Sequence, residues 1–365
     1  YAMAFSGAGS EGYVGLDGVA GIDLNSLFLN QFLDERMSFD LVFAAFQGTF
    51  AVITVALISG AIADRARFGS WMVFAGIWAT LVYFPIAGWV FNFTLDDSGA
   101  IVDGGWLVKD VGLLDFAGGT VVEVGSGAAA LAVALVLGKR FGFRKGMYAP
   151  HNVPLTLIGA GILWFGWFAF NAGSELAADG VASLAFLNTL IAPAAAMLSW
   201  AAFERITSGK PTAVGIASGA IAGAVAITPS CAFLDPVWAI VLGLVVGVVC
   251  AWAIELKFSL GFDDSLDVVG IHLVGGIVGT LFIGLFGRGV GLFFGYPVDQ
   301  LLAQLIGVVT VGVYSFVMAY VIAWGIEKTI GFRVQSVEEE AGIDPAGKWV
   351  IFEGADGSAH TRSVP

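Results

Sequence analysis

The sequence has 365 residues, of which 58% are hydrophobic and only 12% are charged, and its mean hydropathy is +0.88. A soluble domain carries roughly 25% charged residues, so this composition excludes a soluble enzyme, a nucleic-acid-binding protein, a disordered chain and a disulfide-stabilised secreted domain. The net charge of −13 at pH 7 must reside in loops and a tail, because the bilayer core holds no water to solvate it. The composition therefore predicts an integral membrane protein with many spans.

Nine apolar runs are long enough to cross a bilayer, which takes about 20 mainly apolar residues. None of them alternates with the period of two that a barrel strand shows, so all nine are predicted helices and the fold class is an all-α polytopic membrane protein. Small residues recur within the runs, as in helices that pack closely in lipid. The nine runs are residues 38–62, 69–93, 114–138, 152–174, 180–203, 212–230, 236–256, 267–287 and 300–325.

Lysine and arginine fall mainly on alternate loops between these runs. Eleven lie on one side: Arg65, Arg67, Lys139, Arg140, Arg144, Lys145, Arg205, Lys210, Lys257, Lys328 and Arg333. The other side has only three, Arg36, Lys109 and Arg288. Because cytoplasmic loops carry the excess of Lys and Arg, the bias places the first group and the C-terminal tail in the cytoplasm.

Two apolar runs contain an ionisable residue at the same distance from an aspartate. Asp115 precedes Glu123 by eight residues, and Asp264 precedes His272 by eight. Eight residues rise about 12 Å in a helix, close to half of the roughly 30 Å hydrocarbon core. The loop charges make the two runs start on opposite sides, so Glu123 and His272 are expected to meet near the midplane. Such inverted repetition around a central site is typical of inverted-repeat transporters.

A charge inside the bilayer costs at least about 2.5–3.5 kcal/mol, so Glu123 and His272 are candidate functional residues. The alternative is a pair that only ties two helices together, and His272 by itself could be an ordinary core histidine. His151 and His360 have no predicted role. Cys231 and Cys250 show neither metal nor disulfide spacing, and the sequence offers no cofactor motif.

Several motifs resemble the ammonium transporter family (the Amt/Mep/Rh superfamily), in its bacterial Amt branch. They are FQGTF at 46–50, DFAGGTVV at 115–122, PHNVP at 150–154, GWFAFNAGS at 166–174, residues 264–279, and in the tail GFRV at 331–334, EEE at 338–340 and GID at 342–344. The resemblance implies an inverted-repeat bundle of eleven spans, with the N-terminus outside, and a homotrimer with one pore per subunit. The nine spans here correspond to the third to eleventh.

The sequence begins at Tyr1 with a short apolar segment, YAMAF, that cannot span a membrane. It is either a processed N-terminus or the end of a helix whose earlier part is absent, and the resemblance favours the second interpretation. We therefore expect an N-terminally incomplete transmembrane domain, residues 1–330, followed by a cytoplasmic tail, residues 331–365.

The resemblance also implies roles for individual residues. Ser174, Phe50 and Phe91 correspond to the outer ammonium recruitment site, with Trp89 as the alternative to Phe91 because an insertion follows. Phe170 and Phe50 correspond to a stacked gate below it, and Asp115 to an electrostatic support that also caps its helix. A hydroxyl accepts from N–H, and aromatic faces attract a cation within about 6 Å. With 30 phenylalanines in the chain, ordinary packing is the alternative for each ring.

The chain departs from the family at position 123, where most members have a histidine and this sequence has Glu123. Some relatives, notably certain fungal ones, also carry an acidic residue there, so transport remains compatible with the change. A mechanism that needs two neutral imidazoles sharing a proton does not fit. The tail beyond Asp344 also lacks the family's usual ending, which weakens the expectation of regulation by a cytoplasmic PII-type protein.

The predicted function is ammonium or ammonia transport across the plasma membrane for nitrogen uptake. Ammonium is recruited outside and deprotonated near the gate. Ammonia then passes an apolar pore lined by the Glu123–His272 pair, because such a pore cannot replace the ion's hydration. Two alternatives remain, a channel for the intact cation and an ammonium sensor without significant flux. An enzyme is not predicted, since the sequence has no nucleophile–base set, metal cluster or cofactor motif.

Overall fold

The computed structural model describes residues 13–16, 19–23, 38–96, 101–143, 150, 152–341, 343, 350–353 and 359–362. The segment at Tyr1, where we expected the end of a truncated helix, lies outside these residues. The tail motif at 342–344 is described only at Ile343.

The described chain is almost entirely helical. Its helices are α3 (Ser38–Gly60), α4 (Phe68–Trp78), η2 (Ala79–Tyr83), α5 (Phe84–Phe91), α6 (Trp106–Lys109), η3 (Gly119–Val124), α7 (Gly125–Leu137), α8 (Val153–Ala172), η4 (Gly173–Glu175), α9 (Gly180–Thr207), α10 (Ala213–Ile227), α11 (Pro236–Ala253), α12 (Leu256–Leu260), η5 (Val269–Leu273), α13 (Val274–Phe286), η6 (Leu292–Phe294), α14 (Asp299–Thr329) and α15 (Ser336–Ala341). Three antiparallel hairpins lie outside the bundle: β1 (Tyr13–Leu16) with β2 (Ala20–Asp23), β3 (Phe93–Leu95) with β4 (Ile101–Gly104), and β5 (Val350–Glu353) with β6 (Ala359–Arg362).

The nine expected spans correspond to nine apolar helical segments of the described chain. Eight are long and apolar enough to cross a membrane, and the ninth, α10, is a shorter apolar helix. Several are composite: α4, η2 and α5 form one span, and η3 with α7 and η5 with α13 form two more. The fold class predicted from the apolar runs is therefore confirmed, because the length of each run set the length of its helix.

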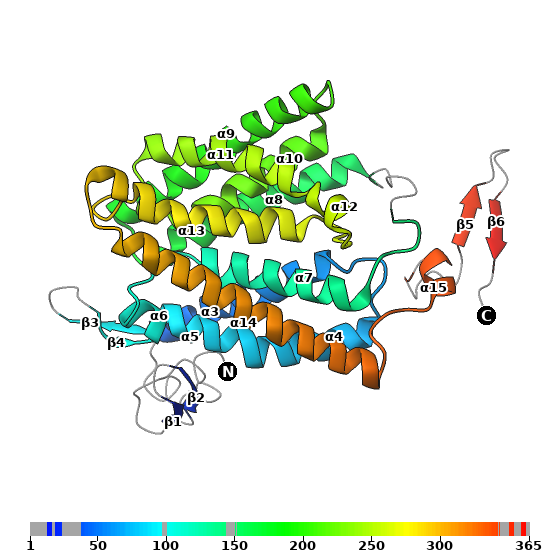
Figure 1. Cartoon of the computed structure of the whole chain (residues 1–365), viewed down its shortest axis with the longest axis horizontal. Coiled ribbons are helices and arrows are strands. Elements are labelled where there is room, and N and C mark those ends of the chain that lie inside the picture. Colours follow the sequence, from blue (N-terminus) through cyan, green and yellow to red (C-terminus); the bar gives the residue numbers. More distant parts are fainter. Residues whose placement is uncertain are drawn as a thin grey trace.

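The helices pack into two groups (Figure 1). One apolar core lies between α3, the α4–α5 span, α7 and α14, and includes Phe50, Trp78 and Val311. The other lies among α8, α9, α10, α11 and α13, and includes Trp167 and Phe282. A small third cluster contains Ala61 just after α3, Ala130 and Ala134 of α7, and Val268 and Val269 at the start of η5. The groups therefore meet at η3–α7 and η5–α13, the two segments that carry the predicted pair.

Candidate functional site

Glu123 and His272 contact each other in the interior of the bundle. The His272 Nδ1 atom lies 2.6 Å from Glu123 Oε2. Glu123 is completely buried and His272 is 6% exposed. The contact expected from the two eight-residue spacings is thus present, and it joins residues 149 positions apart.

Both residues lie in short π-helical segments, Glu123 in η3 and His272 in η5. Each segment continues into an α-helix of 13 residues, α7 or α13. The two composite helices run in opposite directions, with η3 against α13 and η5 against α7 (Figure 1). Single π-helical turns inside helices are frequent at functional sites, and here they mark both halves of one pair.

A glycine four residues after each ionisable residue allows the two helices to approach. A Cβ added at Gly127 would lie 2.4 Å from the backbone nitrogen of Leu273, the residue after His272. A Cβ added at Gly276 would lie 2.8 Å from the Cβ of Glu123. Both separations are shorter than real Cβ contacts allow. The two glycines therefore hold the helices at the distance that the Glu123–His272 contact requires.

Asp115 caps the first of these helices. Its Oδ1 accepts hydrogen bonds from the backbone N–H groups of Gly118 (2.9 Å) and Gly119 (2.7 Å). Its Oδ2 accepts from the Thr120 N–H (2.8 Å), the Thr120 hydroxyl and the Val121 N–H (3.3 Å). Both oxygens are thus occupied, and the carboxylate satisfies N–H groups at the start of η3 that have no partner within the helix.

Asp264 occupies the matching position before η5 but has fewer partners. Its Oδ2 accepts from the Val269 N–H at 2.7 Å. Its Oδ1 is buried and has no hydrogen-bond partner among the described residues. Lys257 lies beside it, donates to the Asp264 carbonyl at 3.1 Å and pairs with Asp267. Burial, with repulsion from Asp267 as the next cause, raises the pKa of Asp264 to about 6.

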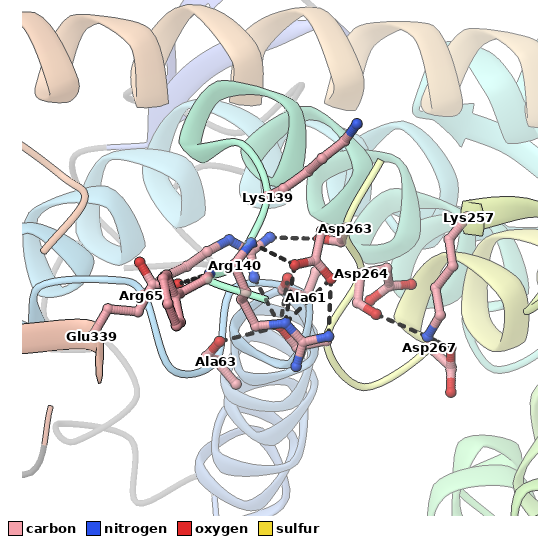
Figure 2. A network of polar contacts seen from close by, with 12 residues as sticks. Ala61, Ala63, Arg65, Lys139, Arg140, Lys257, Asp263, Asp264, Asp267 and Glu339 are labelled. Atoms are coloured by element: carbon pink, nitrogen blue, oxygen red, sulfur yellow. Dashed lines mark hydrogen bonds and ion pairs between the residues drawn. The ribbon is translucent and has the colours of Figure 1, made fainter. Parts of the chain in front are cut away.

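The neighbouring Asp263 belongs to a buried ion network at the same end of the bundle (Figure 2). Its carboxylate accepts three hydrogen bonds from the Arg140 guanidinium, 2.9 Å from Nη2 to Oδ1, 3.0 Å from Nε to Oδ2 and 3.2 Å from Nε to Oδ1. A fourth comes from the Arg140 backbone N–H at 2.7 Å. Arg65 is completely buried and donates to the Asp263 carbonyl and, at 2.8 Å, to the Ser265 hydroxyl. The network joins the loops after α3 and α7 to the segment that leads into η5.

The network shifts the pKa values of its members in opposite directions. Burial lowers the pKa of Arg65 to about 10, although the charge of Asp263 opposes it. Burial also acts to raise the pKa of Asp263, but its hydrogen bonds to Arg140 and the charges of Arg140 and Arg65 outweigh this and lower it. Asp263 is therefore the stably ionised member, since two guanidinium groups surround it.

Two aromatic rings lie between the pair and the opposite end of the bundle. The ring centroids of Phe50 and Phe170 are 4.6 Å apart and the ring planes are tilted by 54°, so the two rings, here called the Phe50–Phe170 stack, are in contact but not parallel. Phe46 packs edge-to-face against Phe50 with a centroid distance of 4.9 Å, and Trp167 stacks on Phe170 at 5.4 Å. Phe50 lines the cavities on both sides of this stack.

The first cavity, here called the Ser174 cavity, has a volume of about 490 Å³. It is lined by Phe46, Phe50, Phe91, Asp115 and Ser174, among others. The Ser174 hydroxyl donates to the Phe170 carbonyl at 2.7 Å, so its oxygen lone pairs remain available to accept from a ligand.

Phe91, rather than Trp89, lines the Ser174 cavity. Trp89 is 7% exposed, packs against Trp106 and Tyr314, and donates its ring N–H to the carbonyl of Val19. Of the two candidates for the recruitment position, Phe91 is thus the one that borders this cavity. The four residues expected at the recruitment site all line this one cavity.

The second cavity, the Glu123 cavity, has a volume of about 250 Å³. It lies on the far side of the Phe50–Phe170 stack and is lined mainly by apolar groups. The lining residues are Thr49, Phe50, Ile53, Leu57, Glu123, Ile162, Leu163, Gly166, Trp167 and Phe170. Glu123 is the only ionisable side chain among them.

Comparison with known proteins identifies the family of the chain. The profile of the Ammonium Transporter Family matches residues 1–347. The chain belongs to the ammonium transporter family. It is 51% identical over 317 residues to an ammonium transporter of Mycobacterium tuberculosis, which covers 84% of this chain and 66% of that protein. The chain therefore spans slightly less than two thirds of the length of that relative. A putative ammonium transporter of Methanothermobacter thermautotrophicus is 46% identical, covering 83% of this chain and 73% of that protein.

Two solved structures show the same fold. One, described as a sensor Amt protein, superposes with a TM-score of 0.82 and 31% identity, covering 95% of this chain and 84% of that one. Mep2 of Saccharomyces cerevisiae superposes with a TM-score of 0.74 and 36% identity, covering 82% and 68%. The chain thus shares its fold with these Amt and Mep2 structures.

Sequence reasoning missed three features of the site. Gly127 and Gly276 were not singled out, although each follows its ionisable residue by four positions and extends the repeated spacing. The ion network of Asp263 was also missed, because its partners lie more than 120 positions away. Trp167 lines the Glu123 cavity, which was not predicted although the residue is part of the GWFAFNAGS motif.

Proposed function

We propose that the protein containing this chain transports ammonium across the plasma membrane. The observation that supports this best is the buried Glu123–His272 pair, separated by the Phe50–Phe170 stack from a cavity with a hydroxyl and aromatic lining. Burying an ionisable pair inside the membrane costs free energy, so such a pair is expected to serve a function. Family membership supplies the substrate, since the curated relatives named above are ammonium transporters.

Recruitment of ammonium is assigned to the Ser174 cavity. The ammonium N–H groups donate to the Ser174 hydroxyl oxygen, and the faces of Phe91 and Phe50 attract the positive charge. Asp115, on the wall of the same cavity, contributes a negative charge without having to contact the ligand. We place this cavity on the extracellular side, because the Lys and Arg bias assigns the opposite end to the cytoplasm.

The proton of ammonium is handled by the Glu123–His272 pair. A narrow apolar pore cannot replace the hydration of a cation, whereas neutral ammonia passes more easily. The pair offers a carboxylate and an imidazole in hydrogen-bond contact, which together take up and release one proton as a coupled unit. The proton then follows polar groups separately from ammonia.

The assembly and regulation carried over from the family are also proposals. We expect a homotrimer with one pathway per subunit and a C-terminal tail on the cytoplasmic side. A PII-type protein is the candidate regulatory partner for that tail. Chemical crosslinking in membranes tests the first expectation, and a single cross-linked species of two copies would contradict it.

The experiment is current and uptake measured on the full-length protein in liposomes, with potassium as competitor. Glu123→Gln should reduce the ammonium-evoked current at least tenfold at equal protein level, because the amide cannot take up a proton. Glu123→His should retain transport, since an imidazole restores a titratable group. An unchanged current in Glu123→Gln would leave the pair with a structural role only. A current carried equally by potassium would favour the channel alternative.

The second candidate function is ammonium sensing. It is favoured by the superposition on the structure described as a sensor Amt protein, which covers 95% of this chain. A sensor binds ammonium at the Ser174 cavity without significant flux. Saturable ammonium binding together with absent uptake in the same liposomes would establish sensing and contradict transport.

A further inference from the structure

The Ser174 cavity is much larger than the ion that it is proposed to recruit. Its volume is about 490 Å³, whereas ammonium is about as large as a water molecule, whose share of liquid volume is about 30 Å³. Cavities of roughly 300–1,000 Å³ hold whole organic molecules. The cavity therefore has room for a ligand considerably larger than ammonium.

Aromatic rings line this cavity on several sides. Seven of its lining residues are phenylalanines, and three of these lie on α3. The other four come from separate segments: Phe91 ends α5, Phe93 begins β3, Phe116 precedes η3 and Phe233 precedes α11. Cages of aromatic rings bind quaternary ammonium ions, because the ring faces attract the positive charge that the methyl groups carry. The lining therefore suits an alkylated cation.

Part of this lining comes from the insertion that follows Phe91. The insertion forms the β3–β4 hairpin, and both strands contribute to the cavity wall, with Phe93 on β3 and Ile101 on β4. Phe93 is 44% exposed, so its ring is accessible to a ligand. The family resemblance assigned no role to these positions, because they lie in the insertion. The hairpin thus adds an apolar wall beyond the residues expected at the recruitment site.

Glu175 gives the cavity a negative charge next to Ser174. It lies in η4, is half-buried and lines the cavity. Its side chain forms a hydrogen bond with the side chain of Asp179, which needs one shared proton and leaves the two carboxyl groups with one negative charge. Asp179 also accepts hydrogen bonds from the backbone N–H groups of Val181 and Ala182, at 2.9 and 3.0 Å. The charge of the cavity is therefore complementary to that of an organic cation.

We propose that the Ser174 cavity is also a binding site for quaternary ammonium ions, held by its phenylalanine faces and by Glu175. Such an ion has no N–H group and so donates nothing to Ser174. It stays outside the Glu123 cavity, because the rings of Phe50 and Phe170 are in contact. An occupied Ser174 cavity excludes ammonium. The binding itself goes beyond the proposed function, and only the resulting inhibition rests on that function.

The test is equilibrium binding of radiolabelled tetramethylammonium to the full-length protein in lipid nanodiscs. We expect one saturable site per chain. Glu175→Gln and Phe93→Ala should each weaken binding about two- to fivefold, and Phe93→Tyr should preserve it, since the ring remains. Ser174→Ala should leave the affinity for tetramethylammonium unchanged, because this ion makes no hydrogen bond. The matched control is Asp299→Asn, which removes an exposed carboxylate at the start of α14 that lines neither cavity.

A second measurement records ammonium-evoked current in liposomes with external tetramethylammonium. The ion should inhibit competitively, so a higher ammonium concentration should restore the current. Absence of saturable binding would overturn the inference, as would binding that both Glu175→Gln and Phe93→Ala leave unchanged, or binding that leaves the current of a conducting protein unaltered. Ammonium current without tetramethylammonium binding contradicts this inference alone. Tetramethylammonium binding with the expected variant effects but without ammonium current contradicts the transport function alone.

Discussion

Asp115 and Asp264 occupy equivalent positions in the two inverted halves, each eight residues before a member of the buried pair. Asp115 accepts five hydrogen bonds through its two oxygens. Asp264 accepts one from the backbone N–H of Val269, and its second oxygen has no hydrogen-bond partner within the described part of the chain. The same spacing therefore produces a saturated helix cap in one half and an incompletely satisfied carboxylate in the other.

The difference arises from what surrounds each aspartate. Two glycines, Gly118 and Gly119, lie three and four residues after Asp115 and let the backbone wrap around the carboxylate. Gly118 has a φ of +118°, which favours glycine. Asp264 is followed instead by Ser265 and by Asp267 and is flanked by the Asp263–Arg140 ion pair. One half is thus organised by backbone N–H groups, and the other by side-chain charges. Substitutions in the two halves should therefore differ in how much they change the free energy of unfolding and in how that change depends on pH.

The largest effect is expected from Asp115→Ala. It leaves several buried N–H groups at the start of η3 without a partner, and each such group costs about 1–3 kcal/mol. We expect the free energy of unfolding to fall by roughly 5 kcal/mol, measured by thermal unfolding in detergent. The matched control is Asp264→Ala, which removes only the hydrogen bond from the Val269 N–H and should lower the free energy of unfolding less. Equal losses in the two variants would show that the halves are held in the same way.

Asp263→Asn should have the next largest effect. Loss of the carboxylate charge removes the acceptor of the Arg140 ion pair and the main negative charge acting on the buried Arg65, and breaking a buried pair in this way costs about 3–5 kcal/mol. Because the pKa of Asp263 is lowered in the folded state, its contribution to stability is present at neutral pH and is lost as the pH falls through that lowered value. The wild type and the variant should therefore converge in stability in strong acid. A constant difference at all pH values would contradict the assignment.

Asp264→Asn should change the pH dependence of stability in the opposite direction. The pKa of Asp264 is raised to about 6 when folded, so between about pH 4 and that value the folded state holds more protons than the unfolded state. The free energy of unfolding of the wild type should then fall as the pH rises through this window. Asn keeps an acceptor for the Val269 N–H and removes the charge, so at pH 7 the variant should be more stable, by up to about 3 kcal/mol. Thermal unfolding between pH 4 and 7 provides the measurement, and parallel curves for the two proteins would refute the explanation.

The smallest effect on stability, with a large effect on transport, is expected from Gly276→Ala. The added methyl group meets the Cβ of Glu123 at 2.8 Å, and such overpacking costs about 1–3 kcal/mol. Displacement of Glu123 from His272 should lower ammonium-evoked current several-fold. Gly159→Ala, where an added Cβ meets nothing within 4 Å, is the control. Normal current in Gly276→Ala would show that the pair tolerates a longer separation.

Much of the architecture could be predicted because it depends on local composition. The length and apolarity of each run determine a membrane helix irrespective of its neighbours, and nine helical segments lie where nine runs were found. The meeting of Glu123 with His272 also followed from sequence, since a rise of 1.5 Å per residue converts equal spacings from opposite sides into equal depths. The family resemblance, carried by contiguous motifs, led to the aromatic stack and to Ser174.

Tertiary structure decided the features that depend on which side of a helix faces which neighbour. Trp89 and Phe91 are two positions apart, and since successive helical residues turn by about 100°, only packing determines that Phe91 reaches the cavity. The ion network needed the folded chain, because Arg65 and Asp263 are 198 positions apart and a charged loop residue shows no pairing preference in sequence. The sequence also could not show that Glu123 Oε1 has no hydrogen-bond partner in the described part of the chain, because a sequence records which acceptors exist but not which donors the fold brings to them.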